Sequence, residues 1–409
     1  MTLVAVAVFA LTYLLVASRT WALLPIGRPG AALLGAVGMV AFGVLSPGEA
    51  WATLDGDTLL LLFGMMMLGG WLVEEGTVDG MERRLVRAAH GSPWRLMVLV
   101  CLASGLLSAL LVNDTVCVFF TPVLLRVCQR ARLPVAPYLL GLATSANLGS
   151  ALTLVGNPQN MLIGSLSGLS FTRFALLSLP AVLVAGLAHL FILAWMYRGL
   201  LPARFEPFES EAKPARLLPP LVVGGVFLGL NLGLHMGWTA LAGVMVLVLS
   251  RRSSPEPVFR RVDWTLLVFF AALFVVVGGL EHTGLVERAI ELLKPYLSLS
   301  TWQGQLGFVV TVLIGSNLVS NVPLVMLLGP GMSELPQPEL GWIELAFVST
   351  VAGNLTLMGS VANLIVAEIA RPVHEIGFRE YLNLGLRTTL ASLVLGVPTL
   401  ILTHAVFGG

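Results

Sequence analysis

Charged residues are scarce in this chain of 409 residues: Asp, Glu, Lys and Arg make up only 11% of it, against roughly 25% in an average soluble protein. Hydrophobic residues make up 57%. Apolar runs of roughly 20 residues, long enough to cross a hydrocarbon core, recur along the whole chain. A soluble protein of this size would need far more polar surface, so the composition predicts a polytopic membrane protein.

Other absences exclude further classes. The net charge of +1 gives no support for nucleic-acid binding. The cysteines Cys101, Cys117 and Cys128 are odd in number and lie in or beside apolar runs, which argues against a disulfide framework. The sequence has no Cys/His ligand spacing and no phosphate-binding Gly-rich loop, so we expect no metal, no cofactor and no ATP-driven pump. Because no nucleophile–base pair is visible, we also expect no enzymatic activity.

The basic residues predict an orientation, because Lys and Arg collect in cytoplasmic loops. One topology places 20 of the 23 basic residues in the cytoplasm. Both termini of this multi-pass protein of the cytoplasmic (inner) membrane then face outward. The topology requires segments 94–132 and 302–330 to enter and leave on the same side, as re-entrant hairpins. The alternative for the first segment is two ordinary spans with a tight turn at Asn113.

An internal repeat is visible at offsets of 203 to 208 residues. Matching motifs follow in one order: "TLLLLFGMMMLGGWLVEEG" with "TLLVFFAALFVVVGGLEHTG", "NDTVCVFFTPVLL" with "NVPLVMLLGP", and "TLVGNPQN" with "TLMGSVAN". The loop before the first motif has no basic residue and the loop before its partner has four. The repeats are therefore predicted to run through the membrane in opposite senses. Inverted repeats with interrupted helices are typical of secondary transporters, which bind substrate near the midplane.

These patterns predict an all-α protein with about 10 spanning segments plus 2 hairpins, arranged as two inverted-topology repeats that each contain a re-entrant helical hairpin and a broken transmembrane helix. The predicted parts are an N-terminal repeat 1–198, with scaffold helices 2–45 and transport elements 58–198; a cytoplasmic linker 199–216; and a C-terminal repeat 217–409, with scaffold helices 217–250, hairpin 302–330 and broken helix 342–370.

Four polar clusters interrupt segments that should be apolar. A helix broken within a membrane exposes N–H groups and carbonyls that can hold a ligand. The predicted substrate-binding residues are Asn113, Thr115, Asn147, Asn157, Asn160, Ser320, Asn321, Asn354, Thr356, Ser360 and Asn363. The predicted backbone breaks are Gly149, Gly156, Pro158, Pro323 and Gly359. The alternative is that these polar side chains only join helices to one another.

One carboxylate, Asp114, is predicted to lie deep in a hairpin. Glu74, Glu75, Glu344 and Glu368 are expected near span ends, where water is accessible. An intramembrane acid marks a functional site by default, so Asp114 is the candidate proton carrier. The alternative is a structural cap whose carboxylate accepts N–H groups at the hairpin tip.

The motifs resemble those of the ion transporter superfamily, which includes arsenite permeases, sodium/proton antiporters and anion/sodium symporters. "NDTVCVFFTPVLL" and "LVSNVPLVMLL" resemble its two hairpins, and "ANLGSALTLVGNPQN" and "AGNLTLMGSVAN" resemble its broken helices. The resemblance implies one central site, a small inorganic or anionic substrate, and a proton or sodium as the coupling ion. Dicarboxylate members carry Ser-Asn-Thr at both hairpin tips, whereas the tips here are "NDT" and "SNV".

An ionised Asp114 would repel a dianion, and no Arg or Lys lies in the four clusters. A neutral substrate fits better, and we expect an antiporter that confers arsenical resistance by proton-coupled efflux of arsenite or antimonite. The alternatives are a sodium- or proton-coupled anion or dicarboxylate transporter, and a sodium/proton antiporter. A partner ATPase, if one associates, is not encoded in this chain.

Overall fold

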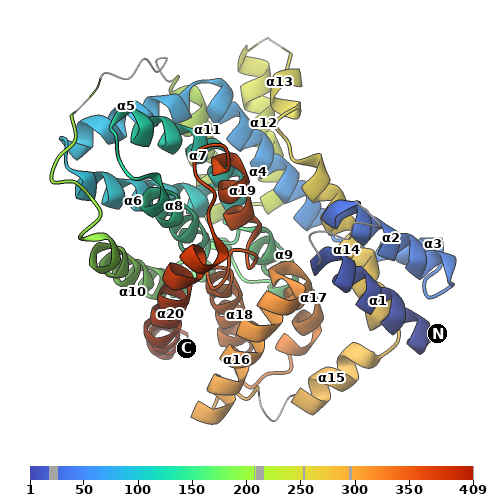
Figure 1. Ribbon diagram of the computed structural model, residues 1–409. Coiled ribbons are helices and arrows are strands. Elements are labelled where there is room, and N and C mark those ends of the chain that lie inside the picture. Colours follow the sequence, from blue (N-terminus) through green and yellow to red (C-terminus); the bar gives the residue numbers. More distant parts are fainter. Residues whose placement is uncertain (18–25, 207, 209–215, 252–253, 294–296, 409) are drawn as a thin grey trace.

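The computed structural model describes the chain except residues 18–25, 207, 209–215, 252–253, 294–296 and 409 (Figure 1). Some residues used in the prediction of orientation lie outside the described residues. These are the basic residues Arg19, Lys213, Arg252 and Lys294, and much of the linker 199–216. The regular secondary structure within the described part is entirely helical, as the sequence predicts.

The helices of the described residues form two sets of ten in the same order. The first set is α1 (Thr2–Ala17), α2 (Gly27–Ala41), α3 (Pro47–Ala52), α4 (Gly56–Glu74), α5 (Thr77–Ala89), α6 (Pro93–Leu110), α7 (Asn113–Arg130), α8 (Val135–Ser150), α9 (Pro158–Ser167) and α10 (Phe171–Tyr197). The second set is α11 (Leu218–Asn231), α12 (Met236–Arg251), α13 (Glu256–Phe259), α14 (Trp264–Glu281), α15 (Leu285–Leu293), α16 (Trp302–Val319), α17 (Asn321–Met332), α18 (Pro338–Ala352), α19 (Val361–Ala370) and α20 (Phe378–Phe407).

Each set ends in its longest helix, α10 with 27 residues and α20 with 30. The helices of the two sets also make reciprocal contacts. Helix α4 packs against α12 while α14 packs against α2, and α7 packs against α19 while α17 packs against α9 (Figure 1). Exchanging the two sets converts each contact into the other, which is the pattern of an approximate two-fold relation. That the repeats are inverted with respect to a membrane stays a prediction.

Five helices of the described part, α4, α6, α10, α14 and α20, are long and apolar enough to cross a membrane. Large apolar side chains project from the outer faces of the longest two: Leu187 and Phe191 on α10 are 69% and 73% exposed, and Val394 and Leu402 on α20 are 68% and 67% exposed. A surface of this kind would be unfavourable in water and is suited to contact with lipid.

Two interruptions separate consecutive helices. Helix α8 ends at Ser150 and α9 begins at Pro158, while α18 ends at Ala352 and α19 begins at Val361. The second broken helix therefore begins at Pro338, four residues before the predicted start of segment 342–370. Pro158 occupies the first position of α9, where its missing N–H has no intrahelical partner to lose. The turns also need glycine: a Cβ at Gly156 would lie 2.2 Å from the Ser150 carbonyl oxygen.

Two predicted breaks have different roles from those expected. Gly149 lies in the last turn of α8, where an added Cβ would lie 2.2 Å from the carbonyl oxygen of Gly105, so it permits close packing of α8 on α6. Pro323 lies in the first turn of α17. The break between α16 and α17 is at Ser320, which has a positive φ of 77°. The two helices of the hairpin therefore part at the tip "SNV" named in the sequence, and Pro323 follows it within α17.

Candidate functional site

Asn147, in the last turn of α8, is the centre of a buried hydrogen-bond network. Its side-chain nitrogen donates to the side-chain oxygens of Asn354 and Asn363, each at 2.9 Å. Its side-chain oxygen accepts from Asn113 at 2.9 Å and from Ser360 at 3.0 Å. The amide of Asn147 is therefore fully satisfied and 1% exposed. One side chain thus joins a hairpin tip, the first broken helix and the second broken helix.

Two further asparagines close the helix breaks in the same way. The Nδ2 of Asn160 donates to the carbonyls ten and seven residues earlier, at 3.2 and 3.0 Å. The Nδ2 of Asn363 donates to the carbonyls ten and seven residues earlier, at 2.8 and 3.2 Å. Both side chains are 0% exposed. These amides replace the helical N–H groups that the breaks remove, and the identical pattern supports the internal repeat.

The two broken helices also bond to each other reciprocally. Ser360 donates to Asn147, and Asn157, which occupies the equivalent position of the first repeat, donates to Thr350 at 3.1 Å. Gln159 also donates to Thr350, at 3.2 Å. Sequence reasoning missed Thr350, but its offset of 203 residues from Asn147, the same as that between Asn157 and Ser360, was a signal that could have identified it.

The first hairpin tip is attached to the network by its backbone and side chain. The N–H of Asn113 donates to the carbonyl of Gly156 at 2.9 Å, and its side-chain oxygen accepts from the N–H of Asp114 at 2.9 Å. Asp114 is 7% exposed. Among the described residues no hydrogen bond or ion pair to its carboxylate is recorded. The structural-cap alternative, in which N–H groups at the tip satisfy this carboxylate, therefore finds no support in the geometry.

Three predicted site residues lie at the edge of the network. Thr115 faces away from the network, with its methyl group against Gly69 of α4. Thr356 donates to the side-chain oxygen of Asn317 at 3.3 Å, and Asn317 in turn donates to the Ala352 carbonyl at 3.2 Å. Ser320 is half-buried at the hairpin joint. Asn317 was not predicted, although it lies in the last turn of α16, three residues before the break at Ser320.

A buried histidine, His189 of α10, lies between α8 and α20 and hydrogen-bonds to both. The hydroxyl of Thr144 donates to the Leu140 carbonyl at 2.6 Å, so its oxygen must accept from Nε2–H of His189 at 3.1 Å. Nδ1 of a neutral His189 then accepts from the hydroxyl of Thr388 at 3.1 Å. Asn354 also donates to the Thr144 carbonyl, at 3.1 Å. His189 therefore joins α8 to α20 as an interior hydrogen-bonding group, as expected of a lone histidine in a span.

Several buried polar atoms of the described residues have no partner. The side-chain oxygens of Asn160 and Asn321 accept no hydrogen bond, and the hydroxyls of Ser108 and Ser316 make none. The orientation of the Asn160 amide is fixed by its two donated bonds, so its free atom is an acceptor. Unpaired buried acceptors are unfavourable unless a bound molecule supplies donors.

The network has few groups that can carry a charge. Its described members are amides and hydroxyls, Asp114 is the one carboxylate at a hairpin tip, and the members include no Lys or Arg. Within the described residues no group of three or more His, Cys, Asp or Glu could hold a metal ion. The network therefore presents neutral hydrogen-bonding groups without a basic side chain among its described members, with the carboxyl of Asp114 beside it.

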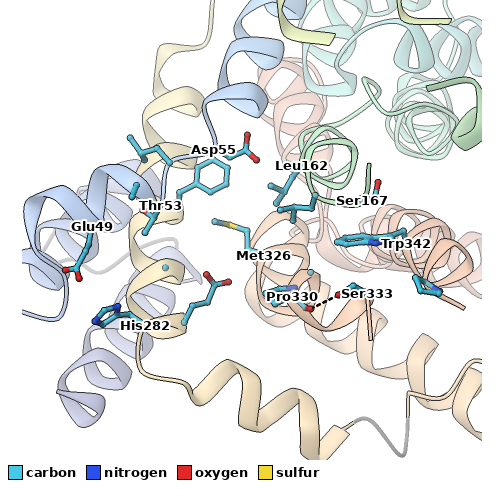
Figure 2. Close-up of a pocket in the computed structure, with 18 of the residues that line it drawn as sticks. Glu49, Thr53, Asp55, Leu162, Ser167, His282, Met326, Pro330, Ser333 and Trp342 are labelled. Carbon is cyan, nitrogen blue, oxygen red and sulfur yellow. Dashed lines mark hydrogen bonds between the residues drawn. The ribbon is translucent and has the colours of Figure 1, made fainter. Parts of the chain in front are cut away.

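An open cavity of about 1030 Å³, called here the vestibule, is lined by residues of α3, α9, α14, α17 and α18 (Figure 2). Glu49, Thr53 and His282 line one wall, and Met326 and Trp342 line the other, on α17 and α18. Hydrogen bonds from the backbone and side chain of Ser46 hold the pKa of Glu49 below its usual range. None of the asparagines of the described network lines the vestibule, so the network is closed off from it in this conformation.

Apolar helices of membrane length around a buried polar network define a polytopic membrane transporter. The family model described as a citrate transporter matches residues 13–352. The chain belongs to this citrate transporter family, and the resemblance to the ion transporter superfamily is confirmed. The protein is thus a transporter and not an enzyme.

Relatives of this chain carry varied names. The "putative transporter arsB" of Dictyostelium discoideum is 31% identical over 93% of this chain and 88% of its own length. The "silicon efflux transporter LSI3" of Oryza sativa is 34% identical over 92% of each chain. The solved structure of the YdaH transporter of Alcanivorax borkumensis aligns with a TM-score of 0.55 at 18% identity, covering 99% of this chain and 97% of that chain, a likeness of fold.

Proposed function

We propose that this protein exports arsenite or antimonite across the cytoplasmic membrane in exchange for protons, with both termini outside. The observation that carries the proposal is the composition of the network: buried amides and hydroxyls, unpaired acceptors at Asn160 and Asn321, and no basic side chain among the described members. Arsenite near neutral pH is an uncharged molecule with three hydroxyl groups, which supplies the donors that these acceptors lack.

The names of two relatives agree with this substrate class. One is named for arsB and the other for silicon efflux, and dissolved silicon is also an uncharged hydroxy acid. A citrate anion, by contrast, carries several negative charges. Burying these charges beside Asp114 without a cation is strongly unfavourable. The citrate description of the family therefore fits this site less well than a neutral hydroxy acid does.

In the proposed mechanism Asp114 carries the coupling proton. It lies next to Asn113, which bonds directly to Asn147, so a change of charge at Asp114 is adjacent to the centre of the network. Asn113, Asn147, Asn157, Asn160, Asn321, Asn354 and Asn363 hold the substrate or the helix ends around it. Release of a proton from Asp114 would favour a neutral occupant over an anion.

Proteoliposomes test the proposal. The wild-type protein should move arsenite in response to an imposed pH gradient, without sodium. Asp114→Asn should lose the response to the gradient while still equilibrating arsenite, and Asp57→Asn, at an exposed aspartate on α4, should behave as wild type. Proton-driven transport that survives in Asp114→Asn would refute the coupling role. Transport of citrate and not of arsenite would refute the substrate.

A further inference from the structure

A second buried carboxyl lies away from the hairpin tips, on α18. The side chain of Glu344 is 0% exposed, although the sequence suggested a water-accessible position near a span end. Both of its carboxylate oxygens are buried without a hydrogen-bond partner. An ionised carboxylate without partners in such a place costs several kcal/mol, so this geometry requires a neutral, protonated group.

The neighbour of Glu344 suits a protonated carboxyl. Gln305 on α16 adjoins the carboxyl of Glu344. The side-chain nitrogen of Gln305 donates to the Leu299 carbonyl at 3.1 Å, which fixes the amide orientation. Its side-chain oxygen is then a buried acceptor without a partner. A protonated Glu344 supplies the missing donor, so one proton satisfies two otherwise unpaired groups.

The charged groups on the helices packed against α18 form no ion pair with Glu344 within the described residues. Arg173 of α10 and His404 of α20 both pair with Glu339, at 2.8 and 3.3 Å. His189 of α10 bonds to two threonines, and the remaining titratable groups of these two helices are Tyr197, Arg379, Glu380, Tyr381 and Arg387. Helices α9, α16 and α17 carry no charged residue, and α8 contributes only the hydroxyl of Tyr138. No recorded ion pair in the described residues involves Glu344.

Glu344 also lies between the vestibule and the network along a single helix. Glu339 and Trp342 line the vestibule, and Thr350 belongs to the network. With a rise of 1.5 Å per residue, Glu344 is about 8 Å along the axis from Glu339 and about 9 Å from Thr350. Glu344 therefore lies within two turns of α18 of both the vestibule lining and the network, although it is itself buried and does not line the vestibule.

We propose that Glu344 is a second proton-binding site of this transporter, neutral in the conformation seen here and donating to the side-chain oxygen of Gln305. Its part in transport rests on the proposed proton coupling, but its protonation does not. On ionisation the O–H bond breaks, the proton passes to water that reaches the site in another conformation, and the unpaired carboxylate destabilises the packing of α16 on α18.

Infrared spectroscopy of the purified full-length protein in lipid, without substrate, tests the proposal. The spectrum should contain a protonated-carboxyl band that shifts in D2O and is lost in Glu344→Gln. In Gln305→Leu the band should move to higher frequency, because the acceptor is gone. Glu339→Gln, on the same helix at the vestibule, is the matched control and should leave the band unchanged, and Asp114→Asn separates any contribution from the hairpin tip.

A spectrum unchanged in Glu344→Gln would refute the proposal, as would a band that does not respond to D2O. In proteoliposomes Glu344→Gln should also lower the number of protons moved per substrate, and an unchanged ratio would refute the role in transport. If wild-type protein does not move arsenite, the proposed substrate fails while the infrared result still decides the state of Glu344.

Discussion

The substitution Asn147→Asp changes one atom group at the centre of the network. It replaces the NH2 group that donates to Asn354 and Asn363 with an oxygen, and leaves the shape of the side chain unchanged. Two buried acceptors then lose their donors and face a negative charge. Each unpaired buried group costs about 1–3 kcal/mol, so we expect a loss of about 2–6 kcal/mol. The oxygen that accepts from Asn113 and Ser360 is retained.

The pH dependence of this variant has a definite sign. Protonation of the new carboxyl restores one donor, so the variant should regain about half of the lost stability as the pH falls, whereas an effect of shape alone would not change with pH. Thermal unfolding in detergent measures this. For a chain of this length the loss corresponds to a decrease in Tm of about 2–7 °C at alkaline pH.

Asn383→Asp is the matched control, because Asn383 is exposed on α20 and its side-chain oxygen accepts from Arg387, an interaction that a carboxylate keeps. The control should unfold at the wild-type temperature throughout. If Asn147→Asp matches this control at alkaline pH, or loses the same stability at every pH, the network does not depend on the two donated bonds and the reasoning is wrong.

Two further substitutions test packing and the surface of the fold. Gly149→Ala should destabilise the protein by about 1–3 kcal/mol or more, because the added Cβ meets the Gly105 backbone. The control Gly186→Ala, with open space around the residue, should be neutral or slightly stabilising. Equal melting temperatures for the two variants would contradict this prediction. Arg173→Gln removes a partly exposed ion pair with Glu339 and a bond to the Phe407 carbonyl, and should lower the melting temperature only slightly. High salt should reproduce the part of this effect that comes from the ion pair. A loss of transport with unchanged melting would show that the pair acts in the transport cycle instead.

Much of the architecture follows from linear patterns. Apolar runs predict membrane-length helices because the bilayer core imposes both their length and their polarity. The motifs "TLVGNPQN" and "TLMGSVAN" predict the helix breaks because proline, glycine and asparagine act on the adjacent backbone. The helix boundaries are less accurate: α18 begins at Pro338, and the second hairpin breaks at Ser320 although the proline is at position 323. A positive φ at a serine has no sequence signature.

The sequence by itself determined that this is a helical, repeated membrane protein with asparagines at its interruptions. Only the tertiary structure decided which of these side chains bond to each other: that Asn147 is the centre of the network, that Thr350 belongs to it and that Thr115 packs against Gly69 of α4. It also decided that Glu344 is buried. The physical reason is range: helix length and breaks depend on neighbours along the chain, whereas burial and hydrogen-bond partners depend on residues about 200 positions away, which come together only through the packing of two halves.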